Sequence, residues 1–264
     1  REGATGRGWR DWQKARDGRS MMHYALFFLV ILAANVIQGI TGFAGTILAM
    51  PPSLMLVGYP VAKPVLNVLG LLSGVYVFAG NRRHVNWQEL KKIVLIMAAG
   101  ILGGILIKGL FEGKEQLLYK LLGLFVIFLA VQGLYHCFRT TDKPPKPASK
   151  YSTLILPVAG VVHGIFVSGG PLLIGYLTKK ITDKTAFRAT ISTVWVFLNS
   201  LILFDDIRSG LWTLDLLKIQ LISIPFLLAG MFLGGKLYAK MSQQLFMKIT
   251  YVLLFLSGVS LLVK

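Results

Sequence analysis

Residues 38–52, QGITGFAGTILAMPP, decide how this chain folds because they place three glycines and two prolines inside strongly hydrophobic sequence. A regular helix is disturbed by such a cluster, since glycine permits irregular backbone and proline removes a hydrogen-bond donor. The pattern returns 125 residues later as HGIFVSGGPLLIG at residues 163–175, where His163 aligns with Gln38. Two helix-breaking motifs at matching places in the halves of a membrane chain indicate a transporter with its substrate site at the breaks.

The composition is that of an integral membrane protein. Of the 264 residues, 55% are hydrophobic and only 15% are charged, and the mean hydropathy is +0.66, whereas soluble domains average about 25% charged residues. We therefore predict an all-α polytopic membrane protein with two repeats of about five helical segments each. The expected segments are 22–38, 46–57, 64–80, 90–107 and 116–138, followed by 153–166, 171–177, 187–204, 214–238 and 243–263.

The predicted organisation is a tail at 1–21, a first transmembrane repeat at 22–138, a polar linker at 139–150 and a second repeat at 151–264. Two interpretations of the tail stay open. It is either a segment that is not native to the chain, or a basic interfacial helix. Segment 46–57 would be only about 18 Å long, short of a hydrocarbon core of about 30 Å. Each glycine motif is thus expected to join broken or re-entrant helices.

The net charge of +17 does not indicate nucleic-acid binding, because Lys and Arg occur in short polar stretches between apolar segments and do not form one basic face. We interpret them as markers of cytoplasmic loops. These loops are 82–92, 139–150, 179–188 and 236–240. They are all cytoplasmic only if residue 22 lies outside and residue 151 inside, which makes the halves inverted repeats. The acidic loop 204–215 then lies outside.

Several motifs resemble the sulfite exporter TauE/SafE family, also called the four-toluene-sulfonate uptake permeases, over essentially the whole chain from residue 22. They are the paired glycine motifs, the polar helix starts AKPVLN (62–67) and AFRATIS (186–192), and the GG-containing fourth segments. The resemblance implies a multi-pass plasma-membrane transporter for sulfur-containing oxyanions such as sulfite, sulfoacetate or other organosulfonates. We expect a secondary transporter that exports its anion by alternating access. A channel-like anion permease and a non-transporting membrane subunit are the alternatives.

The distribution of acidic residues also favours an anion. All eleven lie in loops, in the tail or near segment ends, so no carboxylate is expected in the membrane interior. A cation pump normally needs buried carboxylates, whereas helix N-termini, backbone N–H groups and hydroxyls suffice for an anion. The candidate substrate contacts are Gln38, Gly39, Thr41, Gly42, Gly45, Thr46, Asn67, His163, Gly164, Ser168, Gly169, Gly170, Pro171, Arg188, Thr190 and Asn199.

No enzyme chemistry is expected, because no nucleophile with a base and no metal-binding cluster is visible. The single cysteine, Cys137, excludes an internal disulfide. No cofactor or metal is predicted, and the expected partners are the anion, membrane lipid and a proton or sodium coupling ion. A homo-oligomer is left open.

Some residues carry two interpretations. His163, the only histidine deep within an apolar segment, either contacts substrate, with titration that would supply proton coupling, or is neutral and bonded to a carbonyl. Lys63 and Arg188 either anchor their helices at the interface or attract substrate. Motif glycines such as Gly170 are expected to adopt φ > 0 where the anion approaches. The isolated pairs 103–104 and 234–235 are expected to pack helices away from the site.

Overall fold

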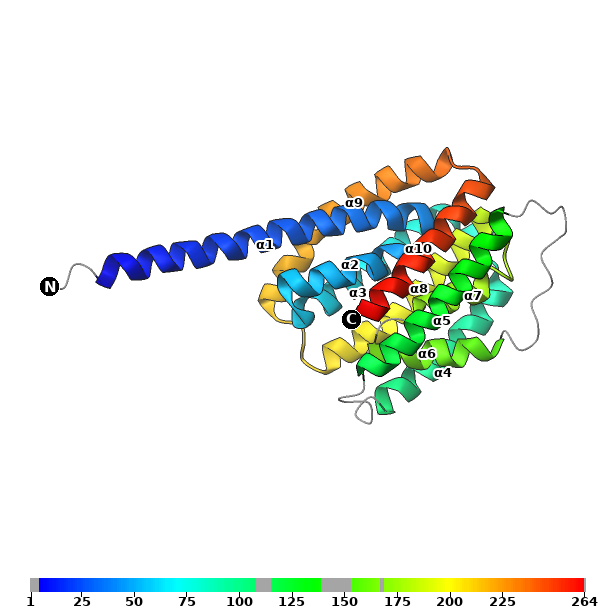
Figure 1. Ribbon diagram of the computed structural model, residues 1–264, viewed down its shortest axis with the longest axis horizontal. Helices are drawn as coiled ribbons and strands as arrows, with labels where there is room; N and C mark the ends of the chain where they lie inside the picture. The colour runs from blue at the N-terminus through cyan, green and yellow to red at the C-terminus, as the bar shows by residue number, and fades with distance from the viewer. Residues whose placement is uncertain (1–4, 108–114, 139–152, 167–168, 264) are drawn as a thin grey trace.

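The computed structural model describes residues 5–107, 115–138, 153–166 and 169–263, and within these residues the chain is helical with no strand (Figure 1). Each predicted segment corresponds to one helix. The first half contains α1 (Thr5–Thr41), α2 (Ala44–Val57), α3 (Tyr59–Asn81), η1 (Arg82–His84), α4 (Trp87–Ile107) and α5 (Glu115–Phe138). The second half contains α6 (Ile155–Phe166), α7 (Gly170–Leu177), α8 (Lys184–Arg208), α9 (Leu214–Ala239) and α10 (Gln243–Val263). The predicted linker at 139–150 lies outside the described residues.

The helices form a membrane-spanning bundle. Among the described residues, four helical stretches are long and apolar enough to cross a membrane: 21–41, 60–84, 184–208 and 214–239. Large apolar side chains also cover the outside of the bundle. Examples are Leu29, Leu95, Leu106, Phe128, Phe204 and Leu221. So much exposed hydrophobic surface is stable only where lipid covers it. The prediction of an all-α polytopic membrane protein is confirmed.

The bundle is built from helix pairs that join its two halves. Helix α1 packs along α9, α4 along α6, α3 along α8, and α5 along α10, and Figure 1 shows α9 beside α1. The first two pairs approach closely at glycines. A Cβ on Gly234 would lie 2.8 Å from the Cα of Gly39, and a Cβ on Gly160 would lie 2.9 Å from the Cα of Gly100. These contacts are typical of small-residue helix packing in membranes.

The isolated glycine pairs therefore behave only partly as expected. Gly104 and Gly234 do pack against neighbouring helices, but Gly234 packs on Gly39, one of the candidate substrate contacts, and not away from the motif. Gly103 and Gly235 have nothing within 4 Å of an added Cβ. Each close packing contact uses one member of its pair, Gly104 or Gly234, and not the adjacent glycine, because adjacent residues point to different faces of a helix.

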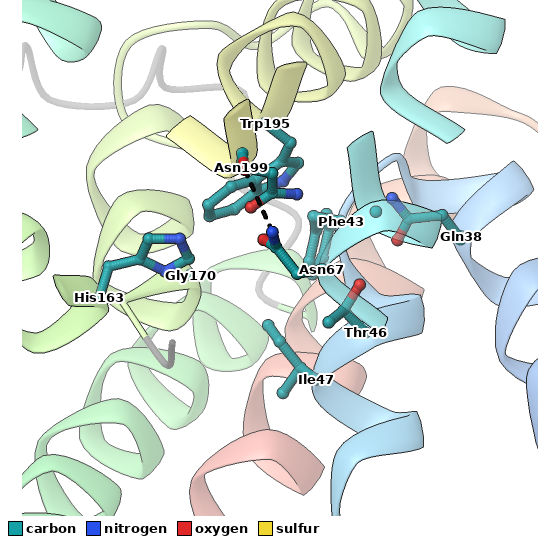
Figure 2. Close-up of a pocket in the computed structure, with 10 residues that line it drawn as sticks. Gln38, Phe43, Thr46, Ile47, Asn67, His163, Gly170, Trp195 and Asn199 are labelled. Carbon is teal, nitrogen blue, oxygen red and sulfur yellow. Dashed lines mark hydrogen bonds between the residues drawn. The ribbon is translucent and has the colours of Figure 1, made fainter. Parts of the chain in front are cut away.

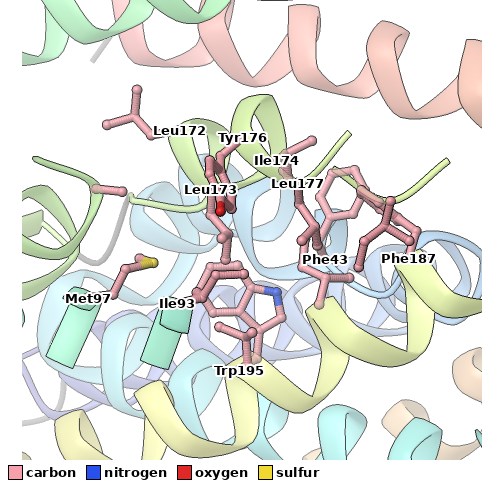
Figure 3. Close-up of a cluster of buried hydrophobic side chains, with 14 of the residues drawn as sticks. Phe43, Ile93, Met97, Leu172, Leu173, Ile174, Tyr176, Leu177, Phe187 and Trp195 are labelled. Atoms are coloured by element: carbon pink, nitrogen blue, oxygen red, sulfur yellow. The ribbon is translucent and has the colours of Figure 1, made fainter. Parts of the chain in front are cut away.

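Helix α7 is the most enclosed element. All eight of its residues are buried, and its length of about 12 Å is far too short to cross a membrane. Figure 3 shows Leu173 of α7 near Trp195 of α8 and Ile93 of α4, within one continuous buried cluster. Packing on every side fixes α7 in position, so its first residue, Gly170, is held rigidly.

Candidate functional site

The first glycine motif breaks the chain between α1 and α2. Gly42 has φ = +83°, a left-handed conformation that suits glycine because other residues carry a Cβ that clashes there. Thr41 bridges the break. Its hydroxyl donates to the carbonyl of Ile37 at 2.9 Å and accepts from the N–H of Ala44 at 3.2 Å. Thr41 thus caps the start of α2 in the manner of an N-cap residue.

Gln38 stabilises the same break with its side-chain amide. Its Oε1 accepts from the N–H of Gly45 at 2.9 Å, and its Nε2 donates to Ser73 Oγ at 3.0 Å and to the carbonyl of Gly42 at 3.3 Å. Ser192 of α8 also donates to the Gly42 carbonyl, at 3.3 Å. Backbone groups freed by the break are therefore satisfied by buried side chains, as a membrane interior requires.

Arg188 of α8 stabilises the end of α1. Its Nε and Nη2 both donate to the carbonyl of Gly39, at 2.9 Å and 2.6 Å, and its guanidinium lies 4.4 Å from the centre of the Tyr238 ring. The last carbonyls of a helix lack intrahelical partners, and a cation there also opposes the negative end of the helix dipole. Arg188 therefore helps to hold the end of α1 in place at the first helix break.

The second break separates α6 from α7. Helix α7 starts at Gly170 with Pro171 in its first turn, and among the described residues no side chain caps this end. His163, the repeat partner of Gln38, lies just before the break and is 4% exposed. Within the described part of the chain, neither of its ring nitrogens has a hydrogen-bond partner. Its ring instead lies 5.4 Å from that of Trp195.

A small pocket lies between the two breaks, and side chains from both halves converge on it (Figure 2). The residues that line it are Gln38, Phe43, Thr46, Ile47, Asn67, Gly70, His163, Gly170, Trp195 and Asn199. Gly70 and Trp195 fall near the middles of α3 and α8, so the pocket is halfway along these spans. The starts of α2 and α7 both reach it. No charged side chain is among its lining residues.

Six of the sixteen candidate contacts line this pocket: Gln38, Thr46, Asn67, His163, Gly170 and Asn199. Candidates that do not line it are Gly39, Thr41, Gly42, Gly45, Gly164, Gly169, Pro171, Arg188 and Thr190. Ser168 lies outside the described residues. Thr190, for example, accepts from the N–H of Asn86 at 2.9 Å, so it fixes the loop before α4. The expected φ > 0 at Gly170 is also absent, since the described glycines with positive φ are Gly42, Gly58 and Gly210.

Sequence reasoning missed Phe43, Ile47, Gly70 and Trp195, which are apolar or lack a side chain. Helical spacing contained a usable signal for two of them. Gly70 follows Asn67 by three residues and Trp195 precedes Asn199 by four, so each shares a helix face with a candidate contact.

The pocket can hold an anion only through neutral donors. Asn67, Asn199, Gln38 and Thr46 supply amides and a hydroxyl, and His163 supplies an imidazole. Asn67 Nδ2 already donates to the backbone carbonyl of Asn199 at 3.1 Å. In the part of the chain that the structure describes, no group of three or more His, Cys, Asp or Glu side chains could hold a metal ion.

One expectation about charge is wrong. Asp206, placed in an external loop from the sequence, belongs to the last turn of α8 and is fully buried, where it forms an ion pair with Lys63 of α3. The helix continues past the apolar segment that was used to bound it, so the acidic side chain is carried onto a face that packs against α3. Lys63 correspondingly points into the protein interface between α3 and α8.

The comparisons with known proteins agree with the geometry. The model of the family described as sulfite exporter TauE/SafE matches residues 27–261. A relative described as the probable inner membrane transporter protein TsaS, from Comamonas testosteroni, is 26% identical over 184 residues, which cover 69% of this chain and 74% of the relative. No solved structure matches the chain.

Proposed function

Because the chain belongs to the sulfite exporter TauE/SafE family, we propose that this multi-pass membrane protein is a secondary transporter that moves a sulfur-containing oxyanion across the cell membrane. The anion class comes from the family description, with sulfite, sulfoacetate and other organosulfonates as the candidate substrates. The relative described as a probable inner membrane transporter supports the same membrane and the same class of function. The proposed direction, export, follows the family's name.

The observation that carries the proposal is the uncharged pocket between the two helix breaks. Oxyanions are bound well by helix N-termini, because unpaired N–H groups and the helix dipole both favour negative charge there. The start of α2 is capped by Thr41 and Gln38. The start of α7 has no side-chain cap among the described residues. We therefore place the anion's oxygens at the start of α7, beside His163.

Alternating access is supported by the way the helices pair. If α1–α5 are exchanged in order with α6–α10, the α1/α9 pair becomes the α6/α4 pair, while the α3/α8 and α5/α10 pairs map onto themselves. This is the packing expected of two repeats related by a two-fold axis. Together with the basic loops, it favours inverted repeats, with a site at their interface that opens alternately to either side.

Direct binding tests the function. Purified protein would be titrated with sulfite, thiosulfate, sulfate, sulfoacetate and methanesulfonate, with acetate and succinate as carboxylate controls. We expect saturable binding of at least one sulfur oxyanion and at least about tenfold weaker binding of both carboxylates, a difference of about 1.4 kcal/mol. Equal affinity for all, or none for any, would reject the proposed substrate class.

Counterflow separates the transport mechanisms. In proteoliposomes loaded with unlabelled sulfite, a transporter that alternates should accumulate external labelled sulfite transiently. A channel-like permease would only equilibrate the label, and a non-transporting subunit would show no uptake.

A further inference from the structure

We infer that the pocket takes a short sulfonate that carries a hydroxyl group, and that Asn67 Oδ1 accepts the hydrogen bond that this hydroxyl donates. This substrate class rests on the proposed transport of a sulfur oxyanion. It is narrower than the class that the family description covers, because it follows from the hydrogen bonds that buried side chains of the pocket lack. It also makes Asn67 the residue that distinguishes one organosulfonate from another.

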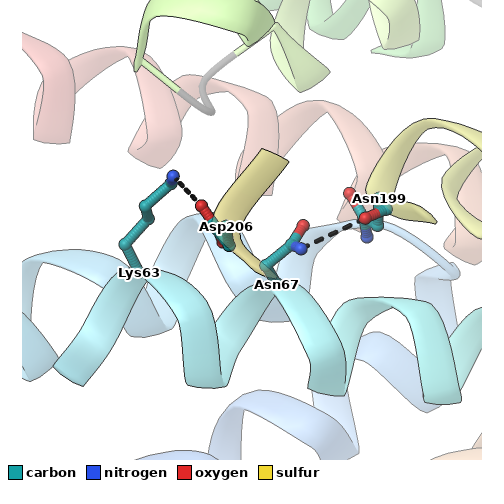
Figure 4. A network of polar contacts seen from close by, with 4 residues as sticks. All are labelled: Lys63, Asn67, Asn199 and Asp206. Atoms are coloured by element: carbon teal, nitrogen blue, oxygen red, sulfur yellow. Dashed lines mark hydrogen bonds and ion pairs between the residues drawn. The ribbon is translucent and has the colours of Figure 1, made fainter. Parts of the chain in front are cut away.

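The amide of Asn67 has a fixed orientation. Its Nδ2 donates to the backbone carbonyl of Asn199 at 3.1 Å (Figure 4). A carbonyl only accepts hydrogen bonds, so turning the amide around would bring two acceptors together. Within the described part of the chain the remaining atom, Oδ1, has no hydrogen-bond partner, although Asn67 is only 1% exposed. A buried acceptor of this kind is costly until a donor reaches it.

Two further residues of the pocket have polar atoms without a hydrogen-bond partner in the described chain: Trp195 at Nε1 and His163 at both ring nitrogens. Both residues are more than nine-tenths buried. The indole N–H can only donate, and a neutral imidazole offers one donor and one acceptor. The Asn199 side chain lies close enough to the imidazole to interact with it. The acceptor that depends on the ligand is therefore the Asn67 oxygen.

An oxyanion alone cannot complete this set of hydrogen bonds. A fully ionised sulfite, sulfate or unsubstituted sulfonate offers only acceptors, so it can bond to the N–H groups of Trp195 and His163 but repels the Asn67 oxygen. A hydroxyl on the same ligand supplies the missing donor. An ammonium group would also donate, but no carboxylate is among the lining residues to offset its charge, and an unpaired buried charge is costly.

The pocket separates the two ends of such a ligand. Figure 2 shows His163 on one side of the pocket and Asn67 on the other. Phe43 and Ile47 add apolar side chains to the lining, which suits a carbon chain between the sulfonate and the hydroxyl. We therefore place the sulfonate beside His163 at the start of α7 and the hydroxyl at Asn67.

The wall beside Asn67 keeps this carbon chain short. Gly70 follows Asn67 by three residues, about one turn of α3. A Cβ on Gly70 would lie 2.7 Å from Asn199 Nδ2 and 3.2 Å from Thr46 Oγ1. The pocket is thus closely packed on this side and has little room to widen. A ligand of the size of hydroxyethanesulfonate suits such a site.

The test compares two ligands of the same size on purified wild-type protein. In propanesulfonate a methyl group replaces the hydroxyl of hydroxyethanesulfonate. The hydroxy ligand should bind at least about tenfold more tightly, because a site with an unpaired polar atom rejects the analogue that cannot pair with it. A pocket that only favours apolar groups would show the opposite order. Methoxyethanesulfonate, which keeps the oxygen but has no donor, should bind no more tightly than propanesulfonate.

Three variants locate the contact. Asn67→Leu removes the acceptor at similar volume, so the preference for the hydroxy ligand should fall below about twofold. The readout is a ratio of two affinities in one sample, so a general weakening of the pocket cancels. Trp195→Phe removes the indole donor and should weaken both ligands while it keeps the ratio. Asn81→Leu is the matched control, because Asn81 also lies on α3 and donates to a carbonyl, that of Val77 at 3.0 Å, but does not line the pocket. It should bind both ligands as the wild type does.

Three results would overturn the inference: wild-type protein that binds propanesulfonate at least as tightly as hydroxyethanesulfonate, a methoxy ligand that matches the hydroxy ligand, or an unchanged preference in Asn67→Leu. The first two use wild-type protein, so they remain decisive even if Asn67→Leu folds poorly. Binding of other sulfur oxyanions without a preference for the hydroxyl would reject this substrate class alone. Failure to bind any sulfur oxyanion would instead reject the proposed function, and this inference with it.

Discussion

Replacement of Gly170 by valine tests whether the pocket holds the anion. An added Cβ at this position would lie 2.9 Å from Ile47 Cδ1 and 3.5 Å from the outer ring atoms of Trp195. All three residues line the pocket, so valine fills the space between them. Gly170 has no positive φ to lose, and Ile47 Cδ1 is the movable end of a side chain. We therefore expect overpacking to cost only about 1–3 kcal/mol of stability.

The same substitution should also weaken anion binding. The anion needs close approach to the start of α7, and the valine methyl groups occupy that approach, so affinity for sulfur oxyanions should fall at least about tenfold, or about 1.4 kcal/mol. Gly170→Ala should give a smaller loss, because it adds one carbon where valine adds three.

Equilibrium binding of labelled sulfite and a thermal unfolding curve would be measured on the same purified samples. Gly103→Val is the matched control, since nothing lies within 4 Å of a Cβ there, and it should bind normally. Gly234→Val would be a poor control because Gly234 packs on Gly39. Wild-type affinity in a monodisperse Gly170→Val sample would refute the proposed position of the anion.

Three further outcomes follow from the two breaks and the proposed orientation. Gln38→Ala should destabilise the protein by about 2–3 kcal/mol, since it removes three buried hydrogen bonds worth about 1 kcal/mol each. His163→Gln is the control, because it removes no hydrogen bond among the described residues. If the two variants lowered the melting temperature equally, this reasoning would be contradicted. Gly42→Ala should cost at least about 1–2 kcal/mol because of its φ of +83°, and unchanged thermal unfolding would disprove the strain. A cysteine introduced within 82–91 should react with impermeant reagents from the cytoplasm and one at Ser209 from outside; labelling of both from one side would reject the inverted repeats.

Hydrophobicity was sufficient to predict the helices. Each apolar segment became one helix, because a membrane forces every spanning backbone to satisfy its own hydrogen bonds. The breaks were predictable from the glycines, since the first break lies at Gly42. The two prolines of the first motif, Pro51 and Pro52, lie inside α2 and do not end it. Helix ends were less predictable. Helix α8 runs from Lys184 to Arg208, beyond its apolar segment at both ends, and this extension is what buries Asp206.

The pocket was only partly predictable, because a motif does not show which of its polar groups form hydrogen bonds within the helix break and which face the pocket. Thr41 and Gly42 look like ligand contacts in the sequence, yet the structure uses them to join α1 to α2. Gln38 does line the pocket, but its amide also bonds to backbone groups of the same join. Gly39 is likewise committed to the crossing with α9. Trp195, in contrast, reaches the pocket through packing between helices far apart in the sequence. The four-residue spacing places Trp195 on the same helix face as Asn199, but a local pattern does not show that this face meets α6 and α7.

The two helix breaks differ in whether their polar side chains already have hydrogen-bond partners. At the first, Gln38 and Thr41 satisfy the start of α2, and Arg188 satisfies the end of α1. At the second, His163 occupies the position of Gln38 but has no hydrogen-bond partner among the described residues. A buried polar side chain without a partner is costly, and this cost is recovered if substrate supplies the missing bond. A pair of repeats can therefore keep one break rigid while the other binds substrate.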